Sequence, residues 1–220
     1  MAAKNQKEID PNAKQTVFLT SRVHPGESNA SFMIQGAIDF LLQNNNKEAK
    51  MLRDQFIFKI VPMLNPDGVI NGHYRCNFIG ADLNRRWPNP SKLLHPEIYY
   101  TKKLMKLCHL DNQVLMFCDF HGHTRKRNVF MYGCVSPVTE INQHKNNNLI
   151  RIMPYLLDQK NKCFSFADCK FANEREKEST GRLVMFKEFG ILNSYTIEST
   201  FYSCLNNKMG LRKRVNVDED

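Results

Sequence analysis

The chain has 220 residues, of which 42% are hydrophobic and 24% are charged. This size and composition fit one globular domain with its own apolar core. The sequence contains no run of eighteen or more apolar residues, and its polar N-terminus lacks the apolar core of a secretory signal. We therefore expect a cytoplasmic protein, neither membrane-spanning nor secreted.

The chain contains seven cysteines, an odd number without any C-x-x-C pair, so we expect reduced thiols and neither disulfides nor a thiolate zinc site. The formal net charge is +9, from 31 Lys and Arg against 22 Asp and Glu, which favours negatively charged partners. Acidic polypeptides and nucleic acids both fit, and an ordinary basic surface explains the charge equally well. The basic cluster Arg212-Lys213-Arg214 is followed closely by the acidic Asp218-Glu219-Asp220, which indicates a charged tail more than a nucleic-acid site.

Hydrophobic periodicity and turn residues predict strands that alternate with helices. In chain order, the expected elements are a strand at Thr16–Val23, a helix over Ile34–Leu42, a strand at Phe56–Met63 covered on both faces, a turn at Asn65–Gly68, a helix over Ile98–Cys108, strands at Val114–Phe120 and Asn128–Cys134, a helix at Leu149–Leu157 around Pro154, a helix at Leu183–Phe189 and a strand at Ile191–Thr200. The runs Asn44–Asn46 and Asn146–Asn148 are expected to be surface loops. The alternation predicts a layered α/β fold with a functional site at the strand ends.

Dispersed metal-binding residue types follow two of these strands. His24 and Glu27 are three residues apart across a Pro-Gly bend, so an imidazole and a carboxylate can converge on one ion. His121 ends a buried strand, and Glu198 lies near the end of another. Catalytic zinc takes three protein ligands and a water, whose pKa it lowers from about 15.7 to about 7. The set therefore predicts metal-assisted hydrolysis, with a carboxylate as general base.

Each of these patterns is weak alone. A single H-x-x-E match is a coincidence roughly nine times in ten, and a glutamate at a strand end is usually exposed to solvent. His121 and His123 share one face of a strand, so either could be the third ligand, while the other packs or holds a neighbour by a hydrogen bond. The joint occurrence of all three patterns is what favours a metal site.

Longer motifs give a more specific indication. The sequence contains H-P-G-E-S-N-A-S, V-P-M-L-N-P-D-G-V-I-N-G, D-L-N-R-R-W, C-D-F-H-G-H-T-R-K-R-N-V-F-M-Y-G-C and S-Y-T-I-E-S-T. From about Phe18 to Phe201 it resembles the cytosolic carboxypeptidases, the tubulin-deglutamylase branch of the zinc metallocarboxypeptidase (M14) family. The resemblance implies a three-layer α/β/α fold with a mixed, mostly parallel central sheet. It also implies an enzyme that removes glutamates from the C-terminus or the side-chain branches of acidic tails.

The resemblance assigns roles to the metal-binding residues. His24, Glu27 and His121 hold one Zn²⁺ per chain, with His121 preferred because the first histidine of D-x-H-G-H is the ligand in these enzymes. Glu198 deprotonates the zinc-bound water and passes the proton to the leaving amine. Asp82 is the carboxylate that orients the first zinc histidine.

Arginines complete the implied site. An exopeptidase binds a free carboxylate, which a guanidinium accommodates with a planar, bidentate fork. Asn84 and Arg85 resemble the clamp for this carboxylate, and Arg75 resembles the arginine that polarises the scissile carbonyl. Arg182 precedes the catalytic glutamate by 198 − 182 = 16 residues, and we expect it to pair with the γ-carboxylate of the substrate glutamate.

For Arg182 the alternative is a solvated arginine at a helix start, and Lys126 and Arg127 are substitute contacts for an acidic tail. Two rival functions remain for the whole chain. A zinc-dependent deacylase of N-acyl acidic amino acids would share the metal ligands and Glu198 but would not need the Asn84-Arg85 clamp. A non-catalytic fragment that binds acidic tails would use the charge without zinc.

The expected organisation is a poorly ordered segment 1–15, a partial catalytic domain 16–205 and a charged tail 206–220. Family members carry a β-sandwich and further strands upstream and extend beyond the catalytic glutamate by more than the 220 − 198 = 22 residues here, so we expect a chain truncated at both ends. Expected partners are the acidic tails of tubulin or other polyglutamylated proteins, in the cytoplasm and at microtubules or cilia, with no nucleic acid and no membrane. The preference for linear or branch-point glutamates and the oligomeric state stay open.

Overall fold

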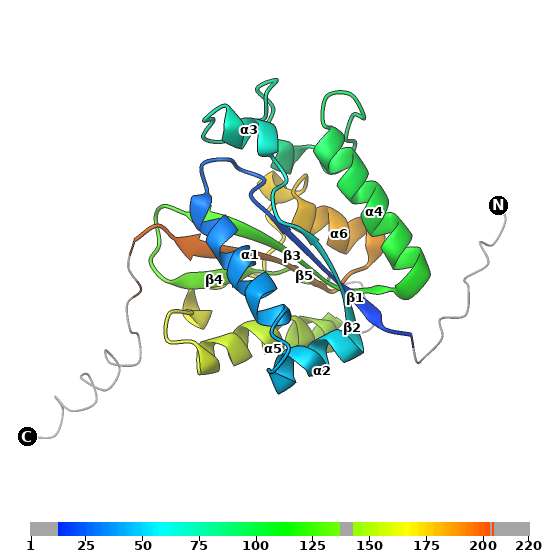
Figure 1. The fold of residues 1–220 in the computed structure, drawn as a ribbon, viewed down its shortest axis with the longest axis vertical. Coiled ribbons are helices and arrows are strands. Elements are labelled where there is room, and N and C mark those ends of the chain that lie inside the picture. The colour runs from blue at the N-terminus through cyan, green and yellow to red at the C-terminus, as the bar shows by residue number, and fades with distance from the viewer. Residues whose placement is uncertain (1–12, 137–142, 203, 205–220) are drawn as a thin grey trace, which may run out of the picture.

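The structure of the protein is a computed structural model that describes residues 13–136, 143–202 and 204 (Figure 1). Residues 1–12 of the expected N-terminal segment and the whole of the expected tail 206–220 lie outside the described residues. The first strand begins at Gln15, one residue earlier than the boundary expected for the catalytic domain.

Five strands form one mixed sheet in the order β2-β1-β3-β5-β4. The strands are β1 (Gln15–Ser21), β2 (Phe56–Val61), β3 (Val114–His123), β4 (Val129–Tyr132) and β5 (Asn193–Thr200). The helices are α1 (Ser28–Leu41), α2 (Lys47–Gln55), α3 (Pro66–Ile70), α4 (Pro96–Asn112), α5 (Gln143–Lys160) and α6 (Gly181–Phe189), with single 3-10 turns at Leu83–Arg85, Phe166–Asp168 and Arg175–Lys177. The pairs β2–β1, β1–β3 and β3–β5 are parallel, and β4 runs antiparallel to β5.

The sheet is the middle of three layers, as predicted (Figure 1). Helices α4 and α6 cover one face, where Trp87, Met105 and Met185 pack on Phe18 and Phe117. Helices α1 and α5 cover the other face, where the core consists of buried residues such as Val17, Leu19, Ile34, Met131 and Tyr195. Complete burial of one such side chain contributes roughly 1.5–3 kcal/mol, so both faces stabilise the sheet.

Strand alternation places polar residues on the face covered by α4 and α6. Phe117, Asp119 and His121 of β3 point to that face, because side chains two residues apart on a strand share a side. Cys118 and Phe120 point to the opposite face, into the core under α1 and α5. The apolar half of β3 therefore anchors the strand, and its carboxyl end presents Asp119 and His121 to a site.

Helix α5 is longer than expected and contains Pro154 and the Asn146–Asn148 run. The expectation of a loop at these asparagines is wrong, because they belong to the first turns of α5. The side chain of Asn147 accepts a hydrogen bond from the backbone N–H of Ser136 (2.8 Å), which fixes the start of the helix to the segment after β4. Pro154 has no N–H to donate to the carbonyl of Ile150. The Tyr195 hydroxyl of β5 donates to that carbonyl instead, at 3.0 Å.

Three further local expectations need correction. Strand β2 lies at one edge of the sheet and is only partly buried, so its apolar run is not covered on both faces. Helix α2 was not predicted, and its N-cap Asn46 accepts from the N–H of Ala49 at 3.0 Å. The turn expected at Asn65–Gly68 is the start of α3, where the Asn65 side chain accepts from Gly68 N. Among the described residues, no helix combines the length and apolar character needed to cross a bilayer.

Candidate metal centre and catalytic cavity

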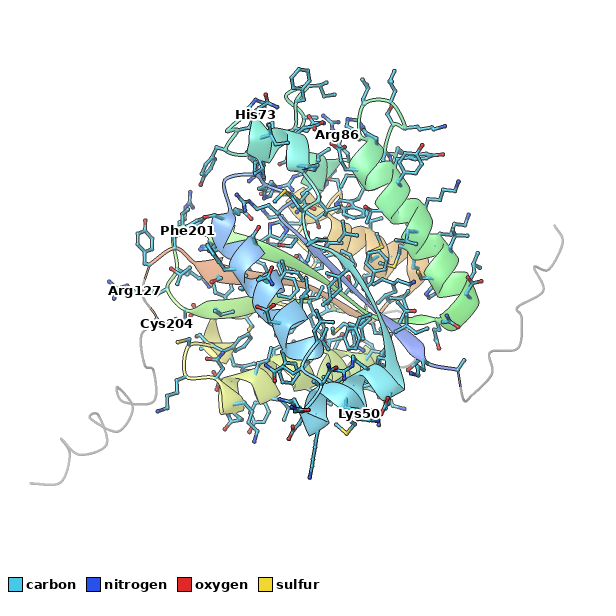
Figure 2. All side chains as sticks on the ribbon, viewed as in Figure 1. Lys50, His73, Arg86, Arg127, Phe201 and Cys204 are labelled. Atoms are coloured by element: carbon cyan, nitrogen blue, oxygen red, sulfur yellow. The ribbon has the colours of Figure 1, made fainter. Side chains whose placement is uncertain are left out.

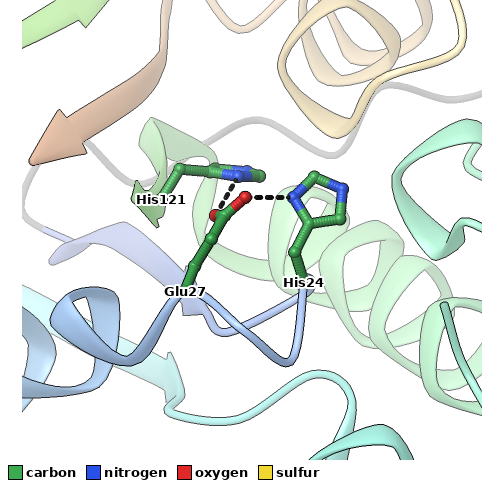
Figure 3. Close-up of side chains that lie close together, drawn as sticks. All are labelled: His24, Glu27 and His121. Carbon is green, nitrogen blue, oxygen red and sulfur yellow. Dashed lines mark hydrogen bonds and ion pairs between the residues drawn. The ribbon is translucent and has the colours of Figure 1, made fainter. Parts of the chain in front are cut away.

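Three side chains that are far apart in the sequence meet beyond the carboxyl end of the sheet (Figure 3). Glu27 lies between the two imidazoles: its Oε1 is 2.7 Å from His24 Nδ1, and its Oε2 is 3.0 Å from His121 Nδ1. One ligand atom of each residue lies within 4.8 Å of the others. Nitrogen and oxygen ligands at the usual zinc bond lengths are separated by about 3.4 Å in a tetrahedral site. The Glu27–histidine distances are slightly shorter than this value and every separation is within 4.8 Å, so small side-chain shifts would let the three groups hold a zinc ion.

The bend between His24 and Glu27 depends on a glycine. The backbone N–H of Gly26 donates to the carbonyl of Tyr74 at 2.8 Å, and the N–H of Glu27 donates to the carbonyl of His24 at 3.2 Å. A Cβ at Gly26 would lie 2.5 Å from Cδ2 of Tyr74, so a larger residue would push this loop away. The local sequence thus places a histidine and a carboxylate on one short turn.

Carboxylates also hold the outer nitrogens of both imidazoles. His24 Nε2 lies 3.2 Å from Asp82 Oδ1, and His121 Nε2 lies 2.7 Å from Asp119 Oδ2. The hydroxyl of Thr20 donates to the other oxygen of Asp119 at 2.7 Å. Carboxylates in this position fix the ring orientation of metal-binding histidines and increase their basicity. Sequence reasoning placed Asp82 but missed Asp119, although D-x-H on a strand puts both residues on one face.

The acidic groups of this cluster favour their charged form. Burial alone would raise the pKa of Glu27, but the charge and hydrogen bonds of His121 and His24 outweigh it and hold that pKa well below its usual value. Burial also opposes ionisation of Asp82, yet His24 and Arg75 lower its pKa. An electrostatic environment of anionic ligands and outer carboxylates suits a divalent cation.

Glu198 lies beside this cluster. Strand pairing puts its Cα opposite that of His121, and both side chains face the α4–α6 side of the sheet. Its Oε2 is buried and has no hydrogen-bond partner within the described chain. Burial, assisted by the negative charge of Glu27, raises the pKa of Glu198 to about 8. A carboxyl group with this pKa and an unpaired oxygen can take up and release a proton near neutral pH. The alternative expectation, a glutamate exposed to solvent, is wrong because this oxygen is buried.

A cavity of about 370 Å³ opens over the cluster. Asn84 accepts from the N–H of Gly181 at 3.0 Å through its Oδ1, and its Nδ2 lies 3.4 Å from His121 Nε2. The Arg85 guanidinium donates to the carbonyl of Asn84 at 3.1 Å. Arg75 pairs with Asp82 Oδ2 through Nε (2.9 Å) and Nη2 (2.8 Å). All three of these predicted residues, Arg75, Asn84 and Arg85, line the cavity.

Arg182 also lines the cavity and is only 5% exposed, so the alternative of a solvated arginine is wrong. It donates to the carbonyl of Gly133 and to Cys134 Sγ (3.4 Å), and its guanidinium lies 5.9 Å from the ring centre of Tyr132. Within the described residues no carboxylate pairs with it. A buried cation without an anionic partner is unusual and suits an anionic ligand.

The substitute contacts proposed from the sequence lie elsewhere. Lys126 pairs with Asp168 (3.1 Å) and lies 4.8 Å from the ring centre of Phe130. Arg127 projects from the edge of the molecule (Figure 2). Neither residue belongs to the cavity lining found in the described chain. Lys170 and Lys177 do line the cavity, and no periodic pattern or motif around these two lysines predicts that position.

His123 has a different role from His121. Its Nδ1 accepts the backbone N–H groups of Arg125 (3.1 Å) and Lys126 (3.0 Å), and its ring packs edge-on against Phe130 at 5.1 Å between centroids. It therefore stabilises the turn after β3, and the metal-binding group contains His121.

The chain is similar to known carboxypeptidases in sequence and in fold. Residues 2–165 match the family described as zinc carboxypeptidase. Cytosolic carboxypeptidase 1 of Xenopus laevis is 49% identical over 199 residues, which cover 86% of this chain and 16% of that protein. Cytosolic carboxypeptidase 2 of Mus musculus is 49% identical over 190 residues, which cover 86% of this chain and 21% of that protein. The chain thus spans a minor part of the length of these relatives.

Solved structures with a similar fold include two bacterial enzymes. The metallo-carboxypeptidase from Burkholderia cenocepacia superposes with a TM-score of 0.73 at 27% identity, over 87% of this chain and 49% of that one. The metallo-carboxypeptidase from Pseudomonas aeruginosa in complex with (2-guanidinoethylmercapto)succinic acid has a TM-score of 0.73 at 25% identity, over 87% of this chain and 50% of that one.

Proposed function

Because the chain belongs to the zinc carboxypeptidase family, we propose that it is a zinc-dependent carboxypeptidase that removes glutamates from the C-terminus or the side-chain branches of acidic protein tails. The observation that carries this proposal is the convergence in one cavity of His24, Glu27 and His121 with Glu198 and the buried Arg182. The first three residues supply a metal site, Glu198 supplies a base, and Arg182 supplies a cation for an acidic side chain.

When bound by His24, Glu27 and His121, zinc supplies a water of lowered pKa and a Lewis acid for the scissile carbonyl. Glu198 Oε2, which is buried and unpaired, accepts the proton of the attacking water. The same carboxyl group then donates the proton to the amine that leaves. Burial raises the pKa of this carboxyl group to about 8, and the charge of a zinc ion held by the neighbouring ligands would lower it from that value.

Two groups of residues orient the substrate. Arg85 and Asn84 bind the free terminal carboxylate, which distinguishes a carboxypeptidase from an endopeptidase. Arg75 polarises the scissile carbonyl. Asp82 engages only the Nε and Nη2 side of the Arg75 guanidinium, which leaves Nη1 for the substrate.

Specificity for glutamate follows from the charge of the cavity wall. Arg182 takes the γ-carboxylate of the terminal residue, and Lys170 and Lys177 add positive charge at the same cavity. A charge-assisted hydrogen bond to a buried guanidinium is worth about 1.5–3 kcal/mol. Tubulin and other polyglutamylated proteins carry tails of this chemistry and are the substrates that we propose. The names of the relatives, cytosolic carboxypeptidases, support a cytoplasmic location, and action at microtubules or cilia is part of the proposal.

The decisive test compares the wild type with Glu198→Gln on a peptide that ends in several glutamates, with zinc present. We expect single-residue losses by mass spectrometry in the wild type and a rate at least about 10²-fold lower in the variant, since the amide cannot carry the proton. Zinc content and peptide binding should be retained. Turnover at the wild-type rate in the variant would exclude Glu198 as the base.

An assay on N-acetylated glutamate separates the rival deacylase. A peptide and an N-acyl amino acid both carry a free carboxylate next to the scissile amide, so, contrary to the expectation from the sequence, the Asn84-Arg85 clamp alone does not separate the two functions. The two substrates differ in what precedes that amide, so a preference for peptides by at least about ten-fold in kcat/KM supports the carboxypeptidase. The reverse preference would favour the deacylase.

The specificity residue is tested with Arg182→Ala. We expect kcat/KM for C-terminal glutamate to fall by about 10- to 100-fold relative to a peptide that ends in alanine, because only the glutamate substrate loses a charge-assisted bond. Arg127→Ala, which removes an exposed arginine, is the matched control. Equal losses on both peptides would show that Arg182 supports the cavity wall without selecting the side chain.

A further inference from the structure

A second groove, of about 610 Å³, lies between α4 and the end of α6. Its described lining shares no residue with the catalytic cavity. The aromatic rings of Tyr99 and Phe189 line it together with Pro88, Pro90 and Glu188, and three lysines of α4 add positive charge.

The lysines occupy one face of α4. Lys102, Lys103 and Lys106 follow Tyr99 by three, four and seven residues, the spacing that brings side chains onto the same side of a helix. Like charges at this spacing destabilise a helix. The fold compensates only Lys102, which pairs with Glu188 (2.7 Å) and donates to the carbonyls of Trp87 and Pro88 (2.8 Å each).

Lys103 and Lys106 are exposed, and within the described residues neither has an ion-pair partner. The groove therefore offers two uncompensated cations beside apolar rings and prolines. In a chain with a net charge of +9, this arrangement attracts anions and gives them a shaped surface.

We infer that this groove binds a segment of an acidic polypeptide and so provides a second contact for acidic substrates, a role that rests on the function proposed above. Carboxylates on alternate residues of an extended peptide are about 6.6 Å apart along the chain. Lysines one helical turn apart have Cβ atoms about 5–6 Å apart and flexible stems, so the two rows match without strict sequence requirements. The rings of Tyr99 and Phe189 accept the methylene groups of glutamate side chains.

The position of the groove supports this role. Asn84 and Arg85 line the catalytic cavity, and Pro88 to Pro90 line the groove only three residues later. Arg86, exposed between them, lies near the start of α4 (Figure 2).

The test uses a fluorescent ten-residue polyglutamate peptide with an amidated C-terminus. The amide removes the free carboxylate that the catalytic clamp needs, so binding reports on other surfaces. We expect the 220-residue chain to bind the peptide at low salt and Lys103→Gln/Lys106→Gln to bind it roughly three- to thirty-fold more weakly. Hydrolysis of a short dipeptide substrate should be unchanged in this variant.

The matched control is Lys47→Gln/Lys50→Gln, which makes the same change in net charge on α2, a helix that contributes no residue to the described lining of the groove; Lys50 is labelled in Figure 2. Equal loss of binding in the control would mean that only net charge matters, which overturns the proposal. Tighter binding of single-stranded RNA than of the peptide, lost in the same α4 variant, would also overturn it. Because the peptide cannot be cleaved, an inactive enzyme would contradict the proposed function and leave the groove measurement valid.

Discussion

Asp119 and Asp82 show how much of the candidate metal centre lies outside its three proposed ligands. Each carboxylate holds the outer nitrogen of one imidazole, so that both rings direct Nδ1 toward Glu27. Asp119 is in turn fixed by Thr20 from the neighbouring strand. The ring orientation, and therefore the direction of the lone pairs offered to zinc, is set by residues that do not touch the metal.

We predict that Asp119→Asn weakens zinc binding by about 10- to 100-fold. The amide keeps the shape of the side chain but removes the negative charge beside Nε2 of His121, which makes the imidazole a weaker ligand. Competition with a chromophoric chelator measures the affinity. Asp168→Asn, at the surface pair with Lys126, is the control and should bind zinc like the wild type. An unchanged affinity in Asp119→Asn would remove Asp119 from the metal centre.

At the scale of elements, α6 and the turn Leu83–Arg85 form one unit. Gly181 at the start of α6 donates to Asn84, and a Cβ at Gly181 would lie 2.9 Å from the indole of Trp87. The buried Trp87 thus packs between the turn that carries Asn84 and Arg85 and the helix that carries Arg182. The proposed carboxylate clamp and the proposed glutamate pocket are held at a fixed distance by this contact.

The contact between α5 and β5 gives a stability prediction. Tyr195→Phe leaves the carbonyl of Ile150 without its donor, which should cost about 1–3 kcal/mol in the free energy of unfolding. In a Pro154→Ala background residue 154 regains an N–H that can donate to this carbonyl, so the same change should cost less. Urea unfolding of the two single variants and the double variant measures the difference. Equal costs in both backgrounds would contradict this account of Pro154.

The N-cap of α4 gives a prediction on pH. Burial, with a contribution from Arg86, lowers the pKa of His95 below its usual value, and its Nδ1 accepts from the backbone N–H of Ser91 at 3.1 Å. The unfolded chain therefore binds this proton more readily than the folded one, so the contribution of His95 is complete above about pH 6.5 and is lost as the pH falls below that value.

We expect the thermal unfolding midpoint of His95→Gln to depend less on pH between 7 and 5 than that of the wild type. The glutamine oxygen still accepts a hydrogen bond but does not titrate. His144→Gln, at an exposed position of α5, serves as the control and should retain the wild-type slope. If the unfolding midpoint of His95→Gln changed with pH as steeply as that of the wild type, the pH dependence would come from other groups.

For the whole molecule, zinc would link segments that are far apart in the sequence and are carried by two neighbouring strands, β1 and β3. His24 and Glu27 follow β1, and His121 belongs to β3, 94 residues after Glu27. Zinc at about 100 times its dissociation constant should stabilise the folded chain by about 2.7 kcal/mol, which for this size is roughly 5–10 °C in the unfolding midpoint. Differential scanning fluorimetry with and without chelator measures this shift, and His24→Ala should abolish it. An identical midpoint with and without zinc would argue against a site built from the folded chain.

The sequence predicts those parts of the molecule that depend on local chemistry. The Pro-Gly bend, the alternation in β3 and the motif around Glu198 place the candidate site residues at strand ends without knowledge of the strand order. Helix α2 was missed because Lys47–Gln55 has few apolar residues and is held by its Asn46 cap. The burial of β2 was overestimated because an apolar run does not reveal whether its strand lies at the edge.

Other features depend on strand order, which the sequence does not give. The hydrogen bond from Tyr195 to Ile150 and the contribution of Lys170 and Lys177 to the cavity arise because the last strand is placed between two earlier ones. Arg182 illustrates the same limit: its distance from Glu198 in sequence favoured a pocket role, and only the fold reveals that it is buried.

The late insertion of β5 between β3 and β4 has a consequence for biosynthesis. A nascent chain on the ribosome has synthesised all three candidate zinc ligands once His121 is made, but Glu198 is added 198 − 121 = 77 residues later. Until then β4 lacks the strand with which it pairs in the described sheet. On the roles proposed above, the ligand set is complete in the nascent chain before the base exists, so hydrolysis would have to wait until the last strand is synthesised and inserted.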